Sequence, residues 1–283
     1  MAGGECNMKN PLISPVVKWV GGKRQLLPEL MKRLPPKITT YYEPFFGGGA
    51  LFFSIQPSKA VLNDSNSELM NVYGCIRDDV DGLITALEAH KNEEEHFYKT
   101  RQLDRTPTFK DLPAIQRAAR IIYLNKTCYN GLFRVNQQGE FNSPFGFYKE
   151  PNIVNAPVLR AVSEFLQKKV CKILTGDYED ALKGIKQGSF VYFDPPYYSV
   201  SNSASFTGYT QNGFGREEQK RLHKLCKMLH SKKIKFMLSN SSDPFIHGLY
   251  RDFNIELVQA RRSINSIGDK RGDVDEVIVR SYG

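Results

Sequence analysis

The segment Asp194-Pro195-Pro196-Tyr197 places an acidic side chain, prolyl carbonyls and an aromatic ring directly after the apolar run at residues 189–193. That run predicts a buried strand, and the prolines must end it, because each lacks an N–H and has a fixed φ. Ligands of open α/β sheets bind at the carboxyl ends of the strands. Two hydrogen-bond acceptors beside a stacking ring suit a planar substrate with an exocyclic amine, such as a nucleobase. The plainer interpretation is an Asp-Pro turn followed by a packing tyrosine.

A second motif is the triple glycine Gly47-Gly48-Gly49, which lies between an apolar run at 41–46 and an apolar helix start. Glycines at such a turn let a ligand approach the backbone. The next predicted strand, residues 60–63, ends in Asp64, where a carboxylate can accept hydrogen bonds from ribose hydroxyls. The glycines lack the spacing of the dinucleotide fingerprint, so they favour a smaller adenosyl ligand over NAD. A tight turn with a surface aspartate is the alternative.

Residues 18–24, Lys-Trp-Val-Gly-Gly-Lys-Arg, resemble a phosphate loop only superficially. That loop needs glycine where Val17 stands and Ser or Thr where Arg24 stands, so the nucleoside-triphosphatase interpretation is rejected. A lysine here can pair with a ligand carboxylate while the indole of Trp19 packs on an apolar group. An ordinary loop explains the composition equally well.

Residues 129–141 predict a β-hairpin, since two β-prone runs flank a polar turn containing glycine. A β-ribbon fits the major groove, and Arg134 beside the turn is suited to a bidentate guanine contact. Tyr129 or Leu132 could wedge between base steps. The alternative is a solvated hairpin. Nearby cations that could contact phosphates are Arg117, Arg120, Lys126 and Lys149.

These motifs require an α/β scaffold, and apolar periodicity indicates how it is divided. Strand-like runs occupy the first zone, helical periods the second, and alternating strands and helices the third. Strands are predicted around 173–174, 190–193, 235–238 and 277–279 in the third zone. The pattern predicts one α/β domain, residues 1–66 and 171–283, interrupted by a second domain at 67–170. The polar stretch 199–215 is expected to act as a lid.

The helical periods are carried by apolar residues spaced i, i+3, i+4 and i+7. They comprise Leu69, Val72, Tyr73 and Ile76; Val80, Leu83, Ile84 and Leu87; Ile115, Ala118, Ala119 and Ile122; and Leu222, Leu225, Cys226 and Leu229.

Composition narrows the functional classes. The 283-residue chain is 41% hydrophobic, as expected of a globular protein, and no stretch approaches the ~18 apolar residues of a membrane span. The five cysteines are scattered and form no Cys-x-x-Cys pair, and the histidines lack ligand spacing. We therefore expect neither a disulfide framework nor a metal site, and we expect a reducing cytosol. The net charge of +9 is compatible with a polyanionic partner or with a solvated basic face.

In this order along the chain, residues 18–23, 43–49 and 194–197 closely resemble the Dam-like, D12 class (α-group) N6-adenine DNA methyltransferases. The resemblance extends to residues 129–134 and 140–146. It implies a Rossmann-like, S-adenosylmethionine-dependent methyltransferase sheet with an inserted helical plus β-hairpin target-recognition domain. The implied reaction is transfer of a methyl group from S-adenosyl-L-methionine, without a metal, to N6 of a flipped adenine in double-stranded DNA, within GATC.

By the same resemblance, individual residues acquire expected roles. The catalytic set would be Asp194, Pro195, Pro196 and Tyr197, which hold the flipped adenine. The cofactor would be bound by Trp19, Lys23, Glu43, Phe45, Gly47, Gly49, Asp64 and Asp194. DNA would be contacted by Lys18, Tyr129, Asn130, Leu132, Arg134, Pro144 and Tyr148.

One departure concerns Phe147, which stands where relatives often have a basic residue, so a phosphate contact is expected to be lost. Three alternatives stand beside the methyltransferase. A non-catalytic DNA-binding protein should have lost part of residues 194–197, an RNA or protein methyltransferase typically has Asn at position 194, and an endonuclease needs an acidic metal cluster. The resemblance also implies a cognate restriction endonuclease as a partner. The expected location is the cytoplasm of a bacterium or a phage host, at the nucleoid. Neither a membrane nor an obligate protein partner is expected.

Overall fold

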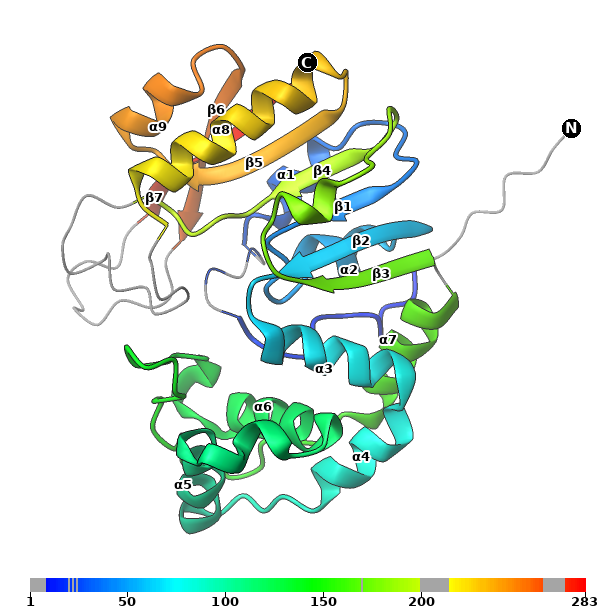
Figure 1. Cartoon of the computed structure of the whole chain (residues 1–283), viewed down its shortest axis with the longest axis vertical. Helices are drawn as coiled ribbons and strands as arrows, with labels where there is room; N and C mark the ends of the chain where they lie inside the picture. Colours follow the sequence, from blue (N-terminus) through cyan, green and yellow to red (C-terminus); the bar gives the residue numbers. More distant parts are fainter. Residues whose placement is uncertain are drawn as a thin grey trace, which may run out of the picture.

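The computed structural model describes residues 9–19, 21, 23, 25–168, 170–198, 214–261 and 273–283. Its centre is a sheet whose strands follow the order β3-β2-β1-β4-β5-β7-β6 (Figure 1). The strands are β1 (Tyr41–Glu43), β2 (Lys59–Asp64), β3 (Val170–Thr175), β4 (Phe190–Phe193), β5 (Lys235–Ser241), β6 (Asn254–Arg261) and β7 (Asp273–Arg280). Strands β1 to β5 pair in parallel, whereas β7 is antiparallel to both β5 and β6.

The strand order reverses beside β1, which has β2 on one side and β4 on the other. Tyr41 is level with Ala60 of β2 and with Phe190 of β4, so the three strands run in step to their carboxyl ends. Such a reversal leaves a crevice outside the strand ends, where ligands of open α/β sheets bind. The strand predicted at 190–193 matches β4, and its end at the proline pair is confirmed.

Alternation along the strands divides the core between the two faces of the sheet. One face carries Tyr41, Ala60, Leu62, Phe190, Tyr192, Met237 and Ile278, together with residues of α1 (Leu27–Lys32), α2 (Ala50–Ile55) and α3 (Ser67–Asp78). The other carries Tyr42, Val61, Val191, Phe193, Phe236, Leu238, Val277 and Val279, together with residues of α8 (Arg216–Ser231) and α9 (Pro244–Leu249). The result is a three-layer α/β/α arrangement, which agrees with the predicted fold class (Figure 1).

The segment between β2 and β3 is helical, and its helices gather beyond β3 (Figure 1). Besides α3 it contains α4 (Val80–Glu88), α5 (Glu94–Gln102), η1 (Leu103–Arg105), η2 (Pro107–Asp111), α6 (Ala114–Thr127), η3 (Tyr129–Gly131) and α7 (Ala156–Lys168); η4 (Asp180–Leu182) follows β3. The periodic apolar residues predicted for these helices are buried or partly buried.

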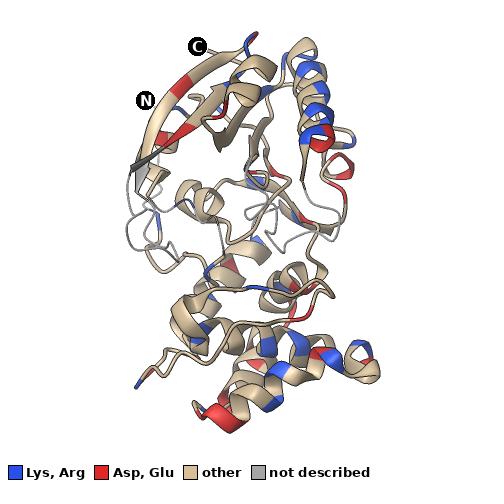
Figure 2. Cartoon of the chain, turned by 90° about the vertical axis from the view of Figure 1, so that its left-hand side faces the viewer, with Lys and Arg blue, Asp and Glu red and all other residues tan. Residues whose placement is uncertain are grey.

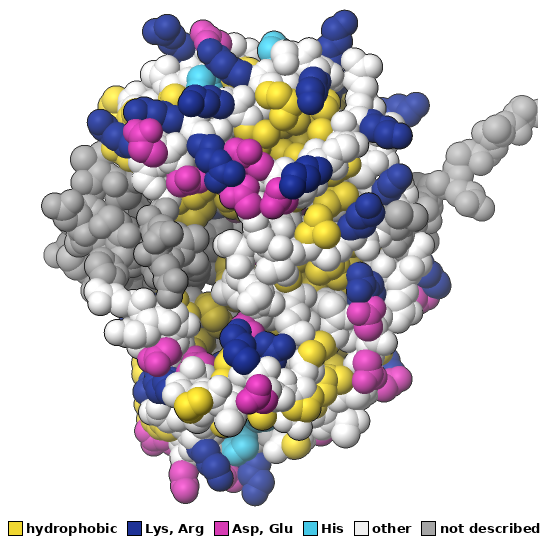
Figure 3. Space-filling model, viewed as in Figure 1, with side chains coloured by type: hydrophobic (Ala, Val, Ile, Leu, Met, Phe, Trp, Pro, Cys, Tyr) yellow, Lys and Arg dark blue, Asp and Glu magenta, His cyan; other side chains and the backbone are white. Residues whose placement is uncertain are grey.

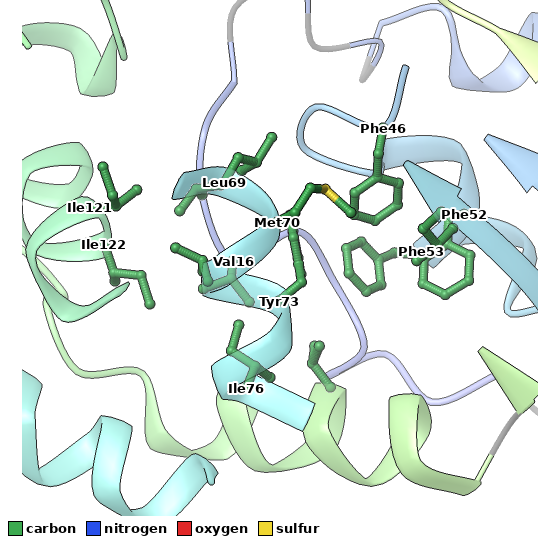
Figure 4. Packing of buried hydrophobic residues seen from close by; sticks show 14 of the residues in the cluster. Val16, Phe46, Phe52, Phe53, Leu69, Met70, Tyr73, Ile76, Ile121 and Ile122 are labelled. Carbon is green, nitrogen blue, oxygen red and sulfur yellow. The ribbon is translucent and has the colours of Figure 1, made fainter. Parts of the chain in front are cut away.

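Helix α3 joins the helical segment to the sheet. On one side Leu69 and Ile76 face Ile121 and Ile122 of α6, and on the other Tyr73 packs against Phe46 with ring centroids 4.8 Å apart (Figure 4). One continuous core therefore extends from the sheet through α3 to α6.

Two details differ from the sequence-based expectations. Residues 129–141 reverse direction, but Tyr129–Gly131 is a 3-10 turn, and the expected ladder is reduced to isolated antiparallel bridges, Val135↔Phe141 and Cys128↔Phe145. Asn130 (φ 58°) and Gly131 (φ 64°) are left-handed, which interrupts an extended strand. The edge strand β6 was not predicted, because outward-facing Leu257, 61% exposed, obscures its alternation.

Candidate active site

The segment that follows β4 meets Lys23 from the amino-terminal part of the chain. Lys23 Nζ lies 2.8 Å from Asp194 Oδ1 and donates a hydrogen bond to the carbonyl of Gly21 at 2.7 Å. The same ammonium lies 4.4 Å from the centroid of the Tyr197 ring, a cation–π contact. Lys23 from one predicted motif therefore contacts both Asp194 and Tyr197 from another.

The carboxyl group of Asp194 is only 19% exposed. Burial, with a smaller contribution from the charge of Glu276, raises its pKa to about 6, against the opposing effect of the ion pair with Lys23. Asp194 is thus a carboxylate at neutral pH, held in surroundings that disfavour its charge.

Tyr197 is fixed by a residue that the sequence did not reveal. Its hydroxyl donates a hydrogen bond of 2.7 Å to Oε2 of Glu276, a buried carboxylate on β7. Burial raises the pKa of Tyr197 well above its ordinary value, with Asp194 and Glu276 adding to the effect, so the hydroxyl stays protonated. Glu276 is the middle residue of Asp-Glu-Val, and no local pattern distinguishes it from a surface acid.

The glycine turn and Asp64, which ends β2 as predicted, are in direct contact. Gly47 N donates to Asp64 Oδ2 at 2.9 Å, and Asn66 N donates to Oδ1 at 2.9 Å. Gly49 has φ 67°, and a Cβ there would lie 2.5 Å from the Phe46 ring, so this position requires glycine. Burial nevertheless raises the pKa of Asp64, despite its two backbone donors.

A third carboxylate, Glu43, is buried at the end of β1. Tyr41 donates a hydrogen bond of 2.8 Å to its Oε2. Burial raises the pKa of Glu43 well above its ordinary value, and the charge of Asp194 adds to this. The ends of β1, β2 and β4 therefore each present an acid whose ionisation is disfavoured.

Aromatic rings cover the same edge of the sheet. Phe45 packs on Tyr178 with ring centroids 4.9 Å apart and meets Phe214 edge-on at 5.6 Å. Tyr178 follows β3 within Gly176-Asp177-Tyr178, another group of residues at a strand end that the sequence analysis did not single out. The predicted strand at 173–174 would have been sufficient to locate it. Trp19 lies against Gly47 and stacks on Phe133 at 4.5 Å.

The residues expected to contact DNA gather at the carboxyl end of α6. Tyr129 N donates to the carbonyl of Pro144 at 2.9 Å, which brings the two arms of the reversal together. Lys18 joins them from the amino-terminal part, because its N–H donates to Asn125 Oδ1 at 2.8 Å and Asn125 Nδ2 donates to the Gly131 carbonyl at 3.1 Å.

Aromatic side chains are conspicuous on this surface. Tyr129 is 59% exposed, Phe147 71% and Tyr148 38%. Arg134 is exposed as well, and its Nε donates to Asn142 Oδ1 at 2.9 Å.

Two of the cations that were predicted to contact phosphates are instead paired with acidic side chains of the protein. Arg120 is buried and ion-paired with Asp104 at 2.8 Å, so its assignment as a phosphate contact was wrong. Arg117 pairs with Glu68 at 2.7 Å. The predicted lid lies outside the described residues except for Phe214 and Gly215. The sequence also offers Arg261, Arg262, Lys270 and Arg271 as a surface that could track phosphates or as a solvated face, and of these residues only the backbone of Arg261 is described.

Charge on the described surface is mixed. Lys and Arg occur both on α8 and on the helical segment (Figure 2), and acidic side chains are interspersed with them (Figure 3). Across the described ranges, no group of three or more His, Cys, Asp or Glu is placed to hold a metal ion. None of the helices in those ranges is both long and apolar enough to span a membrane.

The parallel sheet with an antiparallel β7, and the acids at its strand ends, define a Rossmann-like methyltransferase fold. The chain belongs to the D12 class N6 adenine-specific DNA methyltransferase family, whose model matches residues 19–264. Its methyl donor is S-adenosyl-L-methionine, and its acceptor is adenine N6 in DNA. The family membership favours this interpretation over the RNA, protein and nuclease alternatives.

Curated relatives cover nearly the whole chain. A type II methyltransferase of Lactococcus lactis subsp. cremoris is 45% identical over 96% of this chain and 96% of its own length. A type II methyltransferase of Methanocaldococcus jannaschii is 42% identical over 95% of this chain and 99% of its own. The DNA adenine methylase of Escherichia coli K12 is 33% identical over 93% of each chain.

Proposed function

We propose that this enzyme methylates adenine within GATC in duplex DNA, by flipping the base into the site around Asp194 and transferring the methyl group directly to N6. The observation that supports this most is the convergence of Asp194, Tyr197 and Lys23 at the end of β4. Buried acceptors beside an aromatic ring match an exocyclic amine on a planar base.

The strand ends fit the cofactor chemically. Each carboxylate oxygen of Asp64 accepts one backbone hydrogen bond and has a second lone pair, which can accept from a ribose hydroxyl. In our proposal Phe45 supplies an apolar ring for the cofactor, and Glu43 with the turn at Gly47 and Gly49 lines its pocket. Trp19 lies against that turn. Lys23 supplies an ammonium for a ligand carboxylate. When bound, S-adenosyl-L-methionine supplies a methyl group already activated by a sulfonium, which requires no metal.

The acceptor site activates a poor nucleophile. The lone pair of adenine N6 is delocalised into the ring, so the nitrogen must be drawn toward a tetrahedral geometry. In our proposal Asp194 and the Pro195 carbonyl each accept one N6 hydrogen, which aligns the lone pair for attack. Asp194 is then placed to receive the hydrogen that N6 sheds after methylation.

Tyr197 stacks on the extruded base, which offsets part of the few kcal/mol that unstacking costs. Lys23 occupies one face of this ring in the structure, so it must withdraw before a base can stack there. The second proline, Pro196, keeps the segment from extending β4.

Target reading is assigned to the surface at the end of α6. Arg134 reads a guanine, Leu132 and Pro144 contact the central bases, and Tyr129 and Asn130 fill the gap left by the flipped adenine. Lys18 and Tyr148 contact the outer guanine. The exposure of Tyr129 and Arg134 on one surface supports these roles, and GATC itself rests on the resemblance to Dam-like enzymes.

The names of the relatives support two possible biological settings. Two of the relatives are named type II methyltransferases, so we propose that a restriction endonuclease of the same system is the partner of this enzyme, in the cytoplasm. The adenine methylase relatives favour the second candidate, an enzyme that acts without such a partner. Restriction of unmodified DNA by a neighbouring gene product would decide between them.

The test is transfer of labelled methyl groups to three short duplexes. One contains GATC, one contains the same site already N6-methylated on both strands, and one contains a scrambled site. Label on the first duplex alone is expected. Label on the scrambled duplex as well would overturn the GATC assignment but not the reaction, and label on the premethylated duplex would overturn N6 of that adenine as the acceptor.

A further inference from the structure

Two fully buried amide side chains form a chain of hydrogen bonds behind the segment that follows β4. Gln219 lies on α8 and Asn240 on β5, and neither is exposed to solvent. Asn240 Nδ2 donates to Gln219 Oε1 at 3.0 Å. Burying two amides is unfavourable unless their polar atoms are paired, so the remaining polar atoms of both side chains need hydrogen-bond partners.

Both amides bind the backbone of the candidate acceptor site. Gln219 Nε2 donates to the carbonyl of Pro196 at 3.1 Å. Asn240 Oδ1 accepts from the N–H of Tyr198 at 3.1 Å and from that of Ser241 at 2.9 Å. Ser241 Oγ also donates to the Tyr198 carbonyl at 2.7 Å.

The chemistry of these bonds fixes the direction of both amides. Two N–H groups point at one atom of Asn240, which must therefore be its oxygen, and its NH₂ must face Gln219. Gln219 consequently presents oxygen to Asn240 and its NH₂ to Pro196. Reversing either amide would oppose two donors or two acceptors.

We infer that Gln219 and Asn240 are positioning residues, which set the orientation of the Pro195 carbonyl and of the Tyr197 ring. Residues 194–198 belong to no helix or strand, so the sheet ladder does not hold them. The proline rings fix φ at 195 and 196. Anchoring the carbonyl of Pro196 and the N–H of Tyr198 fixes the peptide planes on either side of Tyr197, and Glu276 holds its ring. The inference rests on the acceptor role proposed above.

The test uses Gln219→Met, which removes both hydrogen bonds at similar volume, and Gln219→Glu, which keeps the acceptor for Asn240 but removes the donor to Pro196. The matched control is Ser239→Ala, next to Asn240 on β5. Ser239 is equally buried and pairs with the Tyr192 hydroxyl at 3.0 Å, without a hydrogen bond to residues 194–198.

Single-turnover methyl transfer is measured at saturating cofactor, on plasmid DNA from a host without adenine methylation, together with the dissociation constant for S-adenosyl-L-methionine. We expect both Gln219 variants to transfer about 10- to 100-fold more slowly with cofactor affinity within about twofold of the wild type, because small misplacements cost rates of that order. The control should stay within about threefold. If the Gln219 variants only lost thermal stability, Ser239→Ala would be affected to a similar extent. Such a loss would also not slow methyl transfer while leaving the affinity for S-adenosyl-L-methionine unchanged.

Wild-type rates in both Gln219 variants would overturn the inference, as would an equal slowing in the control. Plasmid DNA contains many different short sites, so this test does not depend on GATC being the target. If Asp194→Ala retained the wild-type rate, the acceptor role of this segment would fail, and with it the inference. Slow transfer by Gln219→Met beside an inactive Asp194→Ala would support both.

Discussion

The burial of Asp194 predicts that its replacement by asparagine slows the enzyme and stabilises the fold. Asparagine has the shape of the protonated acid, so it removes the charge and little else. Lys23 loses an ionic partner but keeps its hydrogen bond to the Gly21 carbonyl and its contact with the Tyr197 ring.

The magnitude follows from the pKa of Asp194, which burial raises to about 6 in the folded protein. An exposed aspartate titrates at ~3.9, so ionisation costs the folded state about 3 kcal/mol that the unfolded chain does not incur. Below about pH 4 the group is protonated in both states, and this cost is absent. Between about pH 4 and pH 6 only the unfolded chain releases its proton, so the wild type loses stability as the pH rises.

The assay is denaturant and thermal unfolding of wild type and Asp194→Asn from pH 4.5 to pH 8. At pH 7.5 we expect the variant to be more stable by about 2–3 kcal/mol, or ~5 °C in Tm, with the difference shrinking toward pH 4.5. Its methyl-transfer rate should fall by about 10²–10³-fold, because the preorganised acceptor loses its negative charge.

The control is Asp177→Asn, also at a strand end. Burial alone would raise the pKa of Asp177, but two hydrogen bonds from Arg221 outweigh it and hold the pKa below its ordinary value. That substitution should destabilise at neutral pH. An Asp194→Asn variant that is less stable than the wild type, or a difference that does not change with pH, would refute the reasoning.

Three further predictions concern other parts of the site. Because the ionised acid is the acceptor, kcat/KM should fall tenfold per pH unit below about pH 6 and be level above it; a level profile down to pH 5 would contradict the role of Asp194. Asp64→Asn should weaken cofactor binding about 10-fold or more in titration calorimetry, through lost charge-assisted hydrogen bonds, and an unchanged affinity would exclude Asp64 from the pocket. Phe147→Arg should steepen the salt dependence of DNA binding by about one phosphate contact, with Phe147→Leu as the uncharged control; equal slopes in both would place position 147 away from the duplex.

Sequence reasoning located the site where a local rule applied. The proline pair had to end β4, so Asp194 and Tyr197 could be placed at the carboxyl edge of the sheet without coordinates. Spacing after the glycine turn located Asp64 at the end of β2 in the same way. The amphipathic periods of α3, α4, α6 and α8 predicted their buried faces, because burial of one stripe is what stabilises such helices.

What the sequence could not supply were partners brought together by tertiary structure. Glu276 reaches Tyr197 only because β7 inserts between β5 and β6, against the chain order. Arg120 looked like a surface cation close to residues 129–141, yet Asp104 in η1 pairs with it inside the helical segment. Local pattern cannot distinguish a buried ion pair from a phosphate contact, since both need the same side chain.

The acidic side chains at the carboxyl edge of the sheet differ in the partners that they contact. Asp177 receives a guanidinium that makes its charge favourable, as a structural acid requires. Glu43 is paired instead with a phenol, Asp64 with two backbone amides and Asp194 with a lysine, and the pKa of each carboxyl group remains raised. Buried acids whose ionisation is disfavoured, at three neighbouring strand ends, lower stability without improving packing, which is the pattern expected where function opposes stability. The acids that destabilise this fold are therefore the ones we expect to bind the cofactor and the adenine amine.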